Sequence, residues 1–469
     1  MNNLKIHMIG ICGIAMGALA CMLRDLGHEV SGSDMNVYPP MSDLLADSGI
    51  VVHNGYSEEH INGPDLVIIG NAVSRGNPEA ELVLNRKIPY MSMARALYDF
   101  FLRHKNVIAV AGTHGKSTTT ALVAHILSVA GLCPSCFVGG FINNYNANYL
   151  LGEGEFFVIE GDEYDSAFFE KVPKFIFYRP DNLILTSLEY DHADIYGSLE
   201  EIELWFSRLV KIVPSKGHIA YSSEYGNLAN IAGGSFSRTV CFGANGAEFS
   251  YRFTGMNGNY ACLEITGKDG LPFTVRSRLL GDYNFSNITA AACMCLSLGV
   301  DHETVALAVE SFTGVKRRQE LIYCRPGITI YEDFAHHPTA VRAVLSCMKE
   351  YYRDSTLWAL YEPRSATGRR NVFQDSLPGA FLNADRVVIK SPGMLESIPV
   401  NERLDPDRVR DDIEAAGGSA RVFGTVEEII KFVTGEINPD SKNIIVIMSN
   451  GGFDNIYDRI RAAFDSMIN

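Results

Sequence analysis

The residues best suited to chemistry lie in the stretch Gly112-Thr113-His114-Gly115-Lys116-Ser117. Gly112 and Gly115 permit a tight turn with exposed backbone N–H groups, which can bind an anion together with the positive end of a following helix. Lys116 adds a mobile charge for terminal phosphates, and the Ser117 hydroxyl suits Mg²⁺. The spacing is shorter than the full G-x-x-x-x-G-K-[ST] pattern, because Val110 stands where its first glycine would be. We therefore predict a loop that binds a nucleoside triphosphate, and an ordinary strand–turn–helix is the alternative.

Two acidic clusters follow this loop along the chain. The first is Glu160-Gly161-Asp162-Glu163-Tyr164-Asp165, after an apolar run at 156–159, and the second includes Asp191 and His192, after a run at 183–185. Carboxylates crowded at the end of a buried strand repel one another and are costly without a cation. Oxygen ligands and an imidazole downstream of a phosphate loop therefore predict Mg²⁺ sites beside the phosphates of ATP. A solvated acidic turn is the alternative for the first cluster.

The N-terminal stretch predicts a second nucleotide site. A strand at 4–9 leads into Gly10, Gly13 and Gly17, and a helix to residue 26 precedes a strand that ends at Asp34. Such a unit lets the backbone approach a diphosphate, and the terminal Asp can accept hydrogen bonds from a ribose or a base. The spacing G-x-x-G-x-x-x-G differs from the dinucleotide pattern G-x-G-x-x-G, which weakens a dinucleotide interpretation. The run at 66–69 leads into a polar stretch at 70–78, which is either a ligand-binding loop or an ordinary one.

Polar residues also gather at predicted strand ends in the last third of the chain. Strands at 328–331, 357–361 and 443–448 lead into polar residues, and the carboxyl ends of parallel strands meet at one edge of a sheet. We therefore expect one cleft that contains Asp333, His336, His337, Glu362, Arg364 and Ser449. Earlier in the chain, Asn284 and Asn287 share a helical face and could read an adenine edge, with helix capping by Asn284 as the alternative.

The composition limits the class of protein. The chain has 469 residues, of which 47% are hydrophobic and 20% charged, as in an ordinary globular protein of several domains. The net charge of −15 argues against broad nucleic-acid or anionic-membrane binding. We find no apolar run long enough to cross a bilayer and no signal peptide at the N-terminus. Ten scattered cysteines suit reduced cytoplasmic thiols better than a disulfide framework.

The elements that must position these residues alternate between strand and helix, which predicts an α/β protein with parallel sheets. We expect three domains. A Rossmann-like domain at 1–103 would carry the N-terminal glycines, a P-loop ATPase-type domain at 104–320 the phosphate loop, and a second Rossmann-like domain at 321–469 the last cleft.

Together these motifs resemble the ATP-dependent Mur ligase family over essentially the whole chain. The N-terminal glycines are similar to those of members that attach the first peptide unit to UDP-N-acetylmuramate. Three positions depart from the family pattern: Ser117 replaces Thr, Gly161 replaces Ala, and Tyr283 replaces His. The stretch 366–370 after Arg364 also departs from it. The resemblance rests on the phosphate loop, Glu160, Asp162-Glu163, Asp191-His192, Asn284 with Asn287, Lys316-Arg317-Arg318 and the stretch 333–338.

The resemblance implies an ATP- and Mg²⁺-dependent amide-bond ligase. The carboxylate of UDP-N-acetylmuramate would take phosphate from ATP, and the acyl phosphate would react with the recycled murein tripeptide L-alanyl-γ-D-glutamyl-meso-diaminopimelate in the cytoplasm. Addition of L-alanine to the same acceptor is the alternative within the family. A nicotinamide-dependent dehydrogenase and a non-catalytic nucleotide sensor are alternatives from other classes.

The resemblance also implies roles for individual residues. Those implied in catalysis are Lys116, His192, Arg317, His336 and His337, and those implied as metal ligands are Ser117, Glu160 and His192. The UDP-sugar would contact Gly10, Gly13, Gly17, Asp34, Asn71 and Ala72, and the peptide Arg364, His336 and His337. ATP would contact Gly112, Thr113, His114, Gly115, Lys116, Ser117, Thr118, Asn284, Asn287, Arg317 and Asp333.

Overall fold

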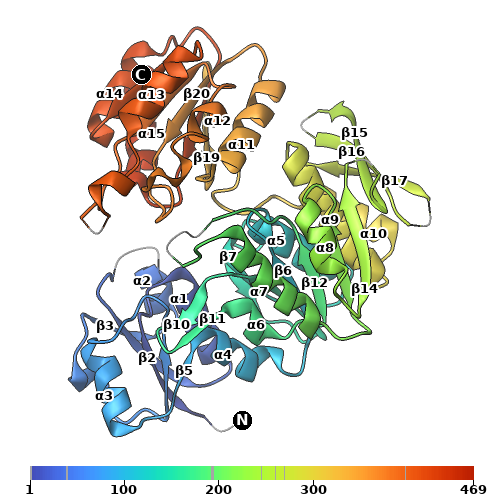
Figure 1. Cartoon of the computed structure of the whole chain (residues 1–469), viewed down its shortest axis with the longest axis vertical. Helices are drawn as coiled ribbons and strands as arrows, with labels where there is room; N and C mark the ends of the chain where they lie inside the picture. Colours follow the sequence, from blue (N-terminus) through green and yellow to red (C-terminus); the bar gives the residue numbers. More distant parts are fainter. Residues whose placement is uncertain are drawn as a thin grey trace. The chain divides into compact units, whose positions relative to one another are not determined.

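The computed structural model describes residues 3–37, 41–191, 195–244, 246–258, 260–268, 270–396 and 398–468, which fold around three larger sheets and a two-stranded ribbon (Figure 1). The predicted α/β class with parallel sheets is confirmed. The chain divides into two units, one of residues 1–188, 200–277 and 286–313, and the other of residues 189–199, 278–285 and 314–469.

The N-terminal sheet is parallel throughout, with the strand order β3-β2-β1-β4-β5. Its order reverses at β1, so the turn after β1 lies at the switch point where open α/β sheets bind ligands. The strands are β1 (Lys5–Ile9), β2 (Glu29–Asp34), β3 (Val51–Asn54), β4 (Leu66–Ile69) and β5 (Tyr90–Ser92). The helices are α1 (Ile14–Asp25), α2 (Met41–Asp47), η1 (Glu58–His60), α3 (Pro78–Arg86), α4 (Met93–Leu97) and η2 (Tyr98–Leu102).

The central sheet has the order β17-β16-β15-β14-β13-β12-β6-β9-β7-β8, with antiparallel hairpins at both edges. Its middle strands are parallel and nearly all apolar, which is typical of a sheet covered on both faces. The strands that carry the site are β6 (Asn106–Ala111), β9 (Phe156–Gly161) and β12 (Asn182–Leu185). The others are β7 (Ser135–Ile142), β8 (Ala147–Leu150), β13 (His218–Ser222), β14 (Arg238–Gly243), β15 (Phe249–Asn257), β16 (Tyr260–Thr266) and β17 (Pro272–Ser277).

Helices and the small ribbon complete this part of the chain. The helices are α5 (Lys116–Val129), α6 (Lys174–Tyr178), α7 (Leu199–Ile212), α8 (Gly226–Ala232), α9 (Asp282–Ser297) and α10 (His302–Ser311). The ribbon pairs β10 (Asp165–Ala167) with β11 (Glu170–Pro173).

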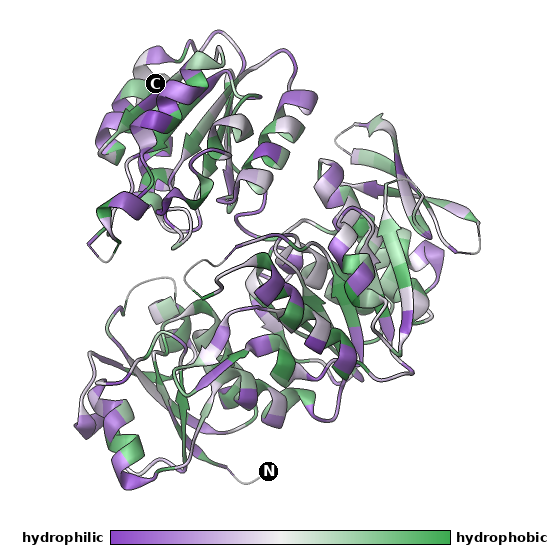
Figure 2. Ribbon diagram, viewed as in Figure 1, coloured by the Kyte–Doolittle hydropathy of each residue, from purple (hydrophilic) through white to green (hydrophobic). Residues whose placement is uncertain are grey.

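The C-terminal sheet has the order β18-β19-β23-β20-β21-β22, in which only the pair β18–β19 is antiparallel within the described residues. Alternate residues of β23 face two separate cores: Ile444 and Val446 pack with α11 and α13, whereas Ile445 and Ile447 pack with α14 and α15. Figure 2 shows the resulting hydrophobic strands between helices with hydrophilic outer faces.

The elements of this sheet region are as follows. The strands are β18 (Glu320–Arg325), β19 (Ile328–Asp333), β20 (Thr356–Tyr361), β21 (Arg386–Lys390), β22 (Ala420–Phe423) and β23 (Asn443–Met448). The helices are α11 (Pro338–Tyr351), η3 (Asn371–Phe373), α12 (Leu377–Ala380), η4 (Val400–Glu402), α13 (Pro406–Ala415), α14 (Val426–Glu436), η5 (Phe453–Asn455) and α15 (Ile456–Ile468).

Each of the ten cysteines lies in the described part of the chain and is a free thiol, as predicted. Among the described residues, no helix combines the length and the apolar character needed to cross a membrane.

Candidate functional site

The phosphate loop joins β6 to α5 as predicted. Gly115 adopts a left-handed conformation (φ +81°) immediately before Lys116, the first residue of α5. A Cβ atom on Gly112 would overlap Thr186, so only glycine fits there. The end of β12 clamps the loop, because the His114 N–H donates to Ser187 Oγ at 2.7 Å and the Thr186 hydroxyl donates to the His114 carbonyl at 2.5 Å. These hydrogen bonds fix the loop against the residues that follow β12.

Lys116 is held at this loop by an ion pair that the sequence did not reveal. Its ammonium donates to the Gly112 carbonyl at 2.6 Å and to both oxygens of Glu163, at 2.9 and 3.0 Å. Burial alone would lower the pKa of Lys116, but the charges of Glu163, Glu160 and Asp162 outweigh burial and raise it. The ammonium is therefore charged and lies at the loop, where it binds the Gly112 carbonyl.

The acidic cluster at 160–165 is largely neutralised by lysines. Lys174 lies 2.7 Å from Asp162 and Lys171 pairs with Asp165, while Glu163 pairs with Lys116. The crowding of these three carboxylates therefore needs no metal ion, which corrects the argument from repulsion. Glu160 differs, because it accepts hydrogen bonds from the Ser117 hydroxyl at 3.0 Å and from the Gly139 N–H at 2.8 Å.

Ser117 and Glu160 present two hard oxygen atoms 3.0 Å apart beside the phosphate loop. Mg²⁺ prefers oxygen ligands and binds through a few protein groups plus substrate phosphates, so this donor set fits Mg²⁺. The third predicted ligand, His192, lies outside the described residues.

Asn287 contacts the phosphate loop directly. Its Oδ1 accepts a hydrogen bond from the Thr119 hydroxyl at 3.2 Å, and a Cβ atom on Gly115 would overlap it. Asn284 is the third residue of α9 rather than its N-cap, so the capping alternative is wrong. The Asn284 amide donates to the Leu280 carbonyl at 2.9 Å. The hydroxyl of Tyr283 is buried and has no hydrogen-bond partner among the described residues.

The N-terminal glycine turn is shaped by the end of β2. The Gly10 N–H donates to the Ser33 carbonyl at 2.8 Å, and the Asp34 carboxylate accepts from the Cys12 N–H at 2.9 Å. A Cβ atom on Gly17 would displace the terminal methyl of Met41, which is the flexible end of that side chain. A Cβ atom on Gly13 would meet nothing closer than 3.9 Å, so the fold alone does not require this glycine. Asn71 and Ala72 follow β4, half-buried and exposed respectively.

In the second unit, Asp333 and Arg317 are tightly held at the ends of β19 and β23. Asp333 accepts from the N–H groups of Gln319 and Ala335, both at 2.8 Å. Burial raises the pKa of this carboxyl although Arg318 opposes the shift. Arg317 lies 2.6 Å from Glu332 and donates to the Ser449 carbonyl at 2.9 Å.

The two adjacent histidines differ in their environments. His337 is the N-cap of α11, where its Nδ1 accepts the Thr339 N–H at 3.2 Å, so the proton of the neutral ring belongs on Nε2. This capping role was not anticipated from the sequence. His336 lies with Nδ1 3.1 Å from the Phe334 carbonyl and with Nε2 3.9 Å from Asp191.

Arg364 is the predicted peptide-binding residue best placed at the strand ends. It packs over Gly451, where a Cβ atom would overlap it, and its guanidinium lies 3.8 Å from Glu362. Arg370 instead pairs with Glu402, and Arg369 donates to the Met394 carbonyl at 2.7 Å.

Lys390 and Asp454 were not predicted as site residues, although Lys390 ends an apolar run that is typical of a strand. Lys390 lies 3.3 Å from Glu362 and 2.7 Å from Asp454. Both positive and negative side chains therefore lie at the carboxyl ends of β20, β21 and β23.

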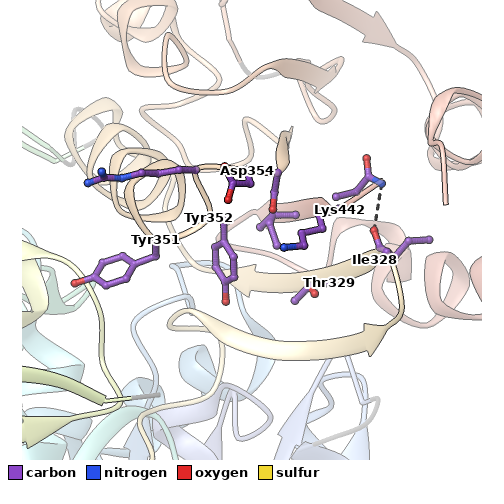
Figure 3. A pocket seen from close by; sticks show the side chains of 11 residues that line it. Ile328, Thr329, Tyr351, Tyr352, Asp354 and Lys442 are labelled. Atoms are coloured by element: carbon purple, nitrogen blue, oxygen red, sulfur yellow. Dashed lines mark hydrogen bonds between the residues drawn. The ribbon is translucent and has the colours of Figure 1, made fainter. Parts of the chain in front are cut away.

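A separate pocket of about 320 Å³ opens at the opposite, amino ends of β19, β20 and β23 (Figure 3). Its lining includes Thr329, Tyr352, Asp354 and Lys442. Ligands of open parallel sheets bind at the carboxyl ends, so this pocket is not part of the candidate site.

Three family models match successive parts of the chain. They are the Mur ligase family, catalytic domain, at residues 5–105, the Mur ligase middle domain at 110–295, and the Mur ligase, glutamate ligase domain, at 317–451.

Individual proteins match over nearly the whole length. The chain is 40% identical to the Escherichia coli K12 UDP-N-acetylmuramate–L-alanyl-γ-D-glutamyl-meso-2,6-diaminoheptandioate ligase, covering 97% of both chains. It is 33% identical to the Clostridium tetani UDP-N-acetylmuramate–L-alanine ligase, covering 95% of both. The crystal structure of a murein peptide ligase from Psychrobacter arcticus matches with a TM-score of 0.74 at 35% identity, covering 98% of both.

The matched ranges cover all three larger sheets and the phosphate loop. The chain therefore belongs to the Mur ligase family of ATP-dependent ligases.

Proposed function

We propose that this ligase joins UDP-N-acetylmuramate to the tripeptide L-alanyl-γ-D-glutamyl-meso-diaminopimelate, at the expense of ATP, in cytoplasmic peptidoglycan recycling. The observation that carries the proposal is the 40% identity, over 97% of both chains, to an E. coli enzyme named for this reaction. The 33% identity to an L-alanine ligase is lower and makes that reaction the second candidate.

The ATP site is proposed at the phosphate loop. Lys116 would leave Glu163 for the terminal phosphates, which present more charge, and the loop N–H groups would hold the β-phosphate. Asn287 braces the loop, and Asn284, Arg317 and Asp333 are proposed further ATP contacts. The remaining proposed contacts are Gly112, Thr113, His114, Gly115, Ser117 and Thr118.

Ser117 and Glu160, with His192, are the proposed metal ligands. A bound Mg²⁺ would supply positive charge where the transferred phosphoryl group develops negative charge. Glu160 is held in place for this role by the Gly139 N–H.

The reaction is proposed in two steps. A muramoyl carboxylate oxygen attacks the γ-phosphorus, the bond to the bridging oxygen breaks, and ADP leaves with that electron pair. The tripeptide amine then attacks the acyl carbon, the C–O bond to phosphate breaks, and the amine loses a proton. Lys116, which lies close to the proposed phosphate position before ATP binds, would stabilise the charge of the first step, so positioning and electrostatics account for most of the acceleration.

The acceptor and the peptide are proposed at the other two sheets. The N-terminal turn with Gly10, Gly13, Gly17, Asp34, Asn71 and Ala72 would bind the UDP-sugar. Arg364, His336 and His337 would bind the peptide, because guanidinium groups suit its carboxylates. We propose three domains: residues 1–103 bind the UDP-sugar, 104–320 bind ATP and 321–469 bind the peptide.

The test is ADP release by the purified full-length protein with UDP-N-acetylmuramate, Mg²⁺-ATP and either tripeptide or L-alanine. We expect a higher kcat/KM with tripeptide and a product of the corresponding mass. Preference for L-alanine would establish the second candidate. Binding of ATP without substrate-dependent ADP release would indicate a sensor, and release of a hydride to NAD⁺ would indicate a dehydrogenase.

A further inference from the structure

A carboxylate that the reaction does not use is buried beneath the N-terminal glycine turn. Glu79 is the second residue of α3 and has 0% exposure. It accepts hydrogen bonds from the Ser33 hydroxyl, from the Ser57 N–H at 3.1 Å and from His60 Nδ1 at 2.7 Å. His7 Nε2 lies 3.5 Å away. These partners come from β1, β2 and the continuous segment 57–60 that contains η1, so one carboxylate joins three segments to α3.

Helix capping does not explain this carboxylate. The side chain of Asn77 already caps α3 by accepting from the N–H groups of Glu79 and Ala80, at 3.0 and 3.1 Å. A buried carboxylate is also a weak means of stabilising a fold, since its desolvation offsets much of the attraction to its partners. The arrangement fits a residue that fixes the geometry of its neighbours better than one that merely adds stability.

The first connection runs through Ser33 to the glycine turn. The Ser33 hydroxyl donates to Glu79, while its carbonyl accepts the N–H groups of Gly10 and Ile11, at 2.8 and 3.1 Å. The next residue, Asp34, binds the Cys12 N–H. Glu79 therefore fixes Ser33, and Ser33 and Asp34 in turn fix the backbone of residues 10–12.

The second connection runs through the loop that follows β3. Glu79 binds the Ser57 N–H and His60, and the Gly55 N–H donates to the Asp34 carbonyl at 2.8 Å. The ring of His60 stacks on that of His53, with centroids 4.3 Å apart and an interplanar angle of 10°. Asp34 is therefore bound twice: this loop binds its carbonyl, and the glycine turn binds its carboxylate.

We infer that Glu79 is a positioning residue for the UDP-sugar site, which holds the Gly10–Gly13 turn and Asp34 in the shape that a nucleoside diphosphate needs. The inference rests on the proposed function. It assigns a role in acceptor binding to a side chain that does not contact the acceptor.

The charge of Glu79 is maintained by its surroundings. Burial would raise its pKa, but the nearby His7 ring and the hydrogen bonds from Ser33, His60 and the Ser57 N–H together lower it below its usual range. The carboxylate is therefore ionised at neutral pH, and replacing it with the neutral amide of Gln removes charge with little change in volume.

The test compares Glu79→Gln with the wild-type full-length enzyme. We expect the KM for UDP-N-acetylmuramate to rise about tenfold, the effect of losing a hydrogen bond to a charged group. The kcat and the KM for ATP should stay within about twofold, because neither the chemical steps nor ATP binding involves this turn. Glu81→Gln is the matched control: Glu81 lies on the same helix and pairs on the surface with Arg75.

A second variant separates positioning from general damage. Ser33→Ala should raise the same KM. The double variant with Ser33→Ala and Glu79→Gln should have a KM no higher than the more affected single variant, because both changes break the same hydrogen bond. Ser33→Ala also carries the test if Glu79→Gln fails to fold.

The opposing outcomes are distinct. An unchanged KM, an equal loss of ATP affinity, a fall in kcat alone, or additive effects in the double variant would overturn the positioning role. Wild-type enzyme that does not turn over UDP-N-acetylmuramate would instead reject the proposed function, and the inference would fall with it.

Discussion

The ammonium of Lys116 lies 2.9 Å from Glu163 Oε2, in an ion pair that the phosphate loop itself supports through the Gly112 carbonyl. The lysine is thus charged and held close to its proposed position before ATP arrives. Because Glu163 is a single carboxylate and a triphosphate carries several negative charges, an exchange of partners on ATP binding is favourable.

Replacing Lys116 with Ala should reduce ADP release by about 10²–10³-fold or more, the cost of losing a preorganised charge contact to the transition state. Lys171→Ala is the control, since that lysine is also paired with an acidic residue of the cluster but is exposed. Turnover within about threefold of wild type in Lys116→Ala would remove the residue from the mechanism.

Replacing Glu160 with Gln should raise the Mg²⁺ concentration for half-maximal activity by about tenfold or more, because a neutral amide is a poorer ligand for a hard cation. Ser117→Thr keeps the hydroxyl that faces Glu160 and should retain activity, whereas Ser117→Ala should not. Titrations of ADP release against Mg²⁺ decide the matter. Superimposable titrations for wild type and Glu160→Gln would contradict the proposed metal site.

The openness around Gly13 makes it a selective probe of the acceptor site. Gly13 has φ −64° and a Cβ atom there meets nothing closer than 3.9 Å, so Gly13→Val is compatible with the backbone. We expect calorimetry to show at least about tenfold weaker binding of UDP-N-acetylmuramate, with ATP affinity nearly unchanged. Gly17→Val changes helix packing instead, because its side chain would have to displace the terminal methyl of Met41. Equal loss of both ligands in Gly13→Val would mean that the two nucleotide sites are misassigned.

A buried histidine on the phosphate-loop helix should make stability depend on pH. Burial lowers the pKa of His125, which contacts Tyr145 OH at 2.8 Å and Ser311 Oγ at 3.0 Å. The unfolded chain takes up a proton below a pH of about 6.5 while the folded state resists it, so stability is lost as the pH falls from there toward the folded pKa. The loss cannot exceed about 1.4 kcal/mol per pH unit for one proton.

His125→Gln should therefore show a shallower fall in the free energy of unfolding between pH 7 and pH 5 than wild type does. The exposed His104, changed to Gln, is the control. Parallel pH profiles for all three proteins, from denaturant titrations at each pH, would exclude His125 as the source.

The sequence predicted the strands and glycines of the site because their signals are local. Apolar runs that end in polar residues located β6, β9, β12, β19, β20 and β23, and the spacing of Gly112, Gly115 and Lys116 located the phosphate loop. A run of buried residues next to a glycine turn has few alternative structures, so the prediction needed no tertiary information.

The partners of these residues could not be predicted, because they lie far away along the chain. Lys116 and Glu163 are 47 residues apart, and Ser33 and Glu79 are 46 apart. Hydrophobic periodicity says which face of an element is buried, but not which polar side chain meets which. Crowded carboxylates near residue 160 therefore suggested a metal ion or a solvated acidic turn, whereas lysines account for most of their neutralisation.

Replacing Arg364 with Ala tests which amine is joined. A tripeptide carries several carboxylates on a protein of net charge −15, so local cations must bind it, and Arg364 lies at the carboxyl end of β20 beside Glu362 and Gly451. We expect kcat/KM for the tripeptide to fall by about tenfold or more, the cost of losing a charged hydrogen bond, while Mg²⁺-ATP binding is unchanged. L-alanine offers one carboxylate and should lose less. Arg386→Ala, which removes an exposed arginine from the start of the neighbouring strand β21, is the control. If Arg364→Ala left the tripeptide rate intact, or if wild type preferred L-alanine, the basic strand ends would not be the determinant of peptide choice.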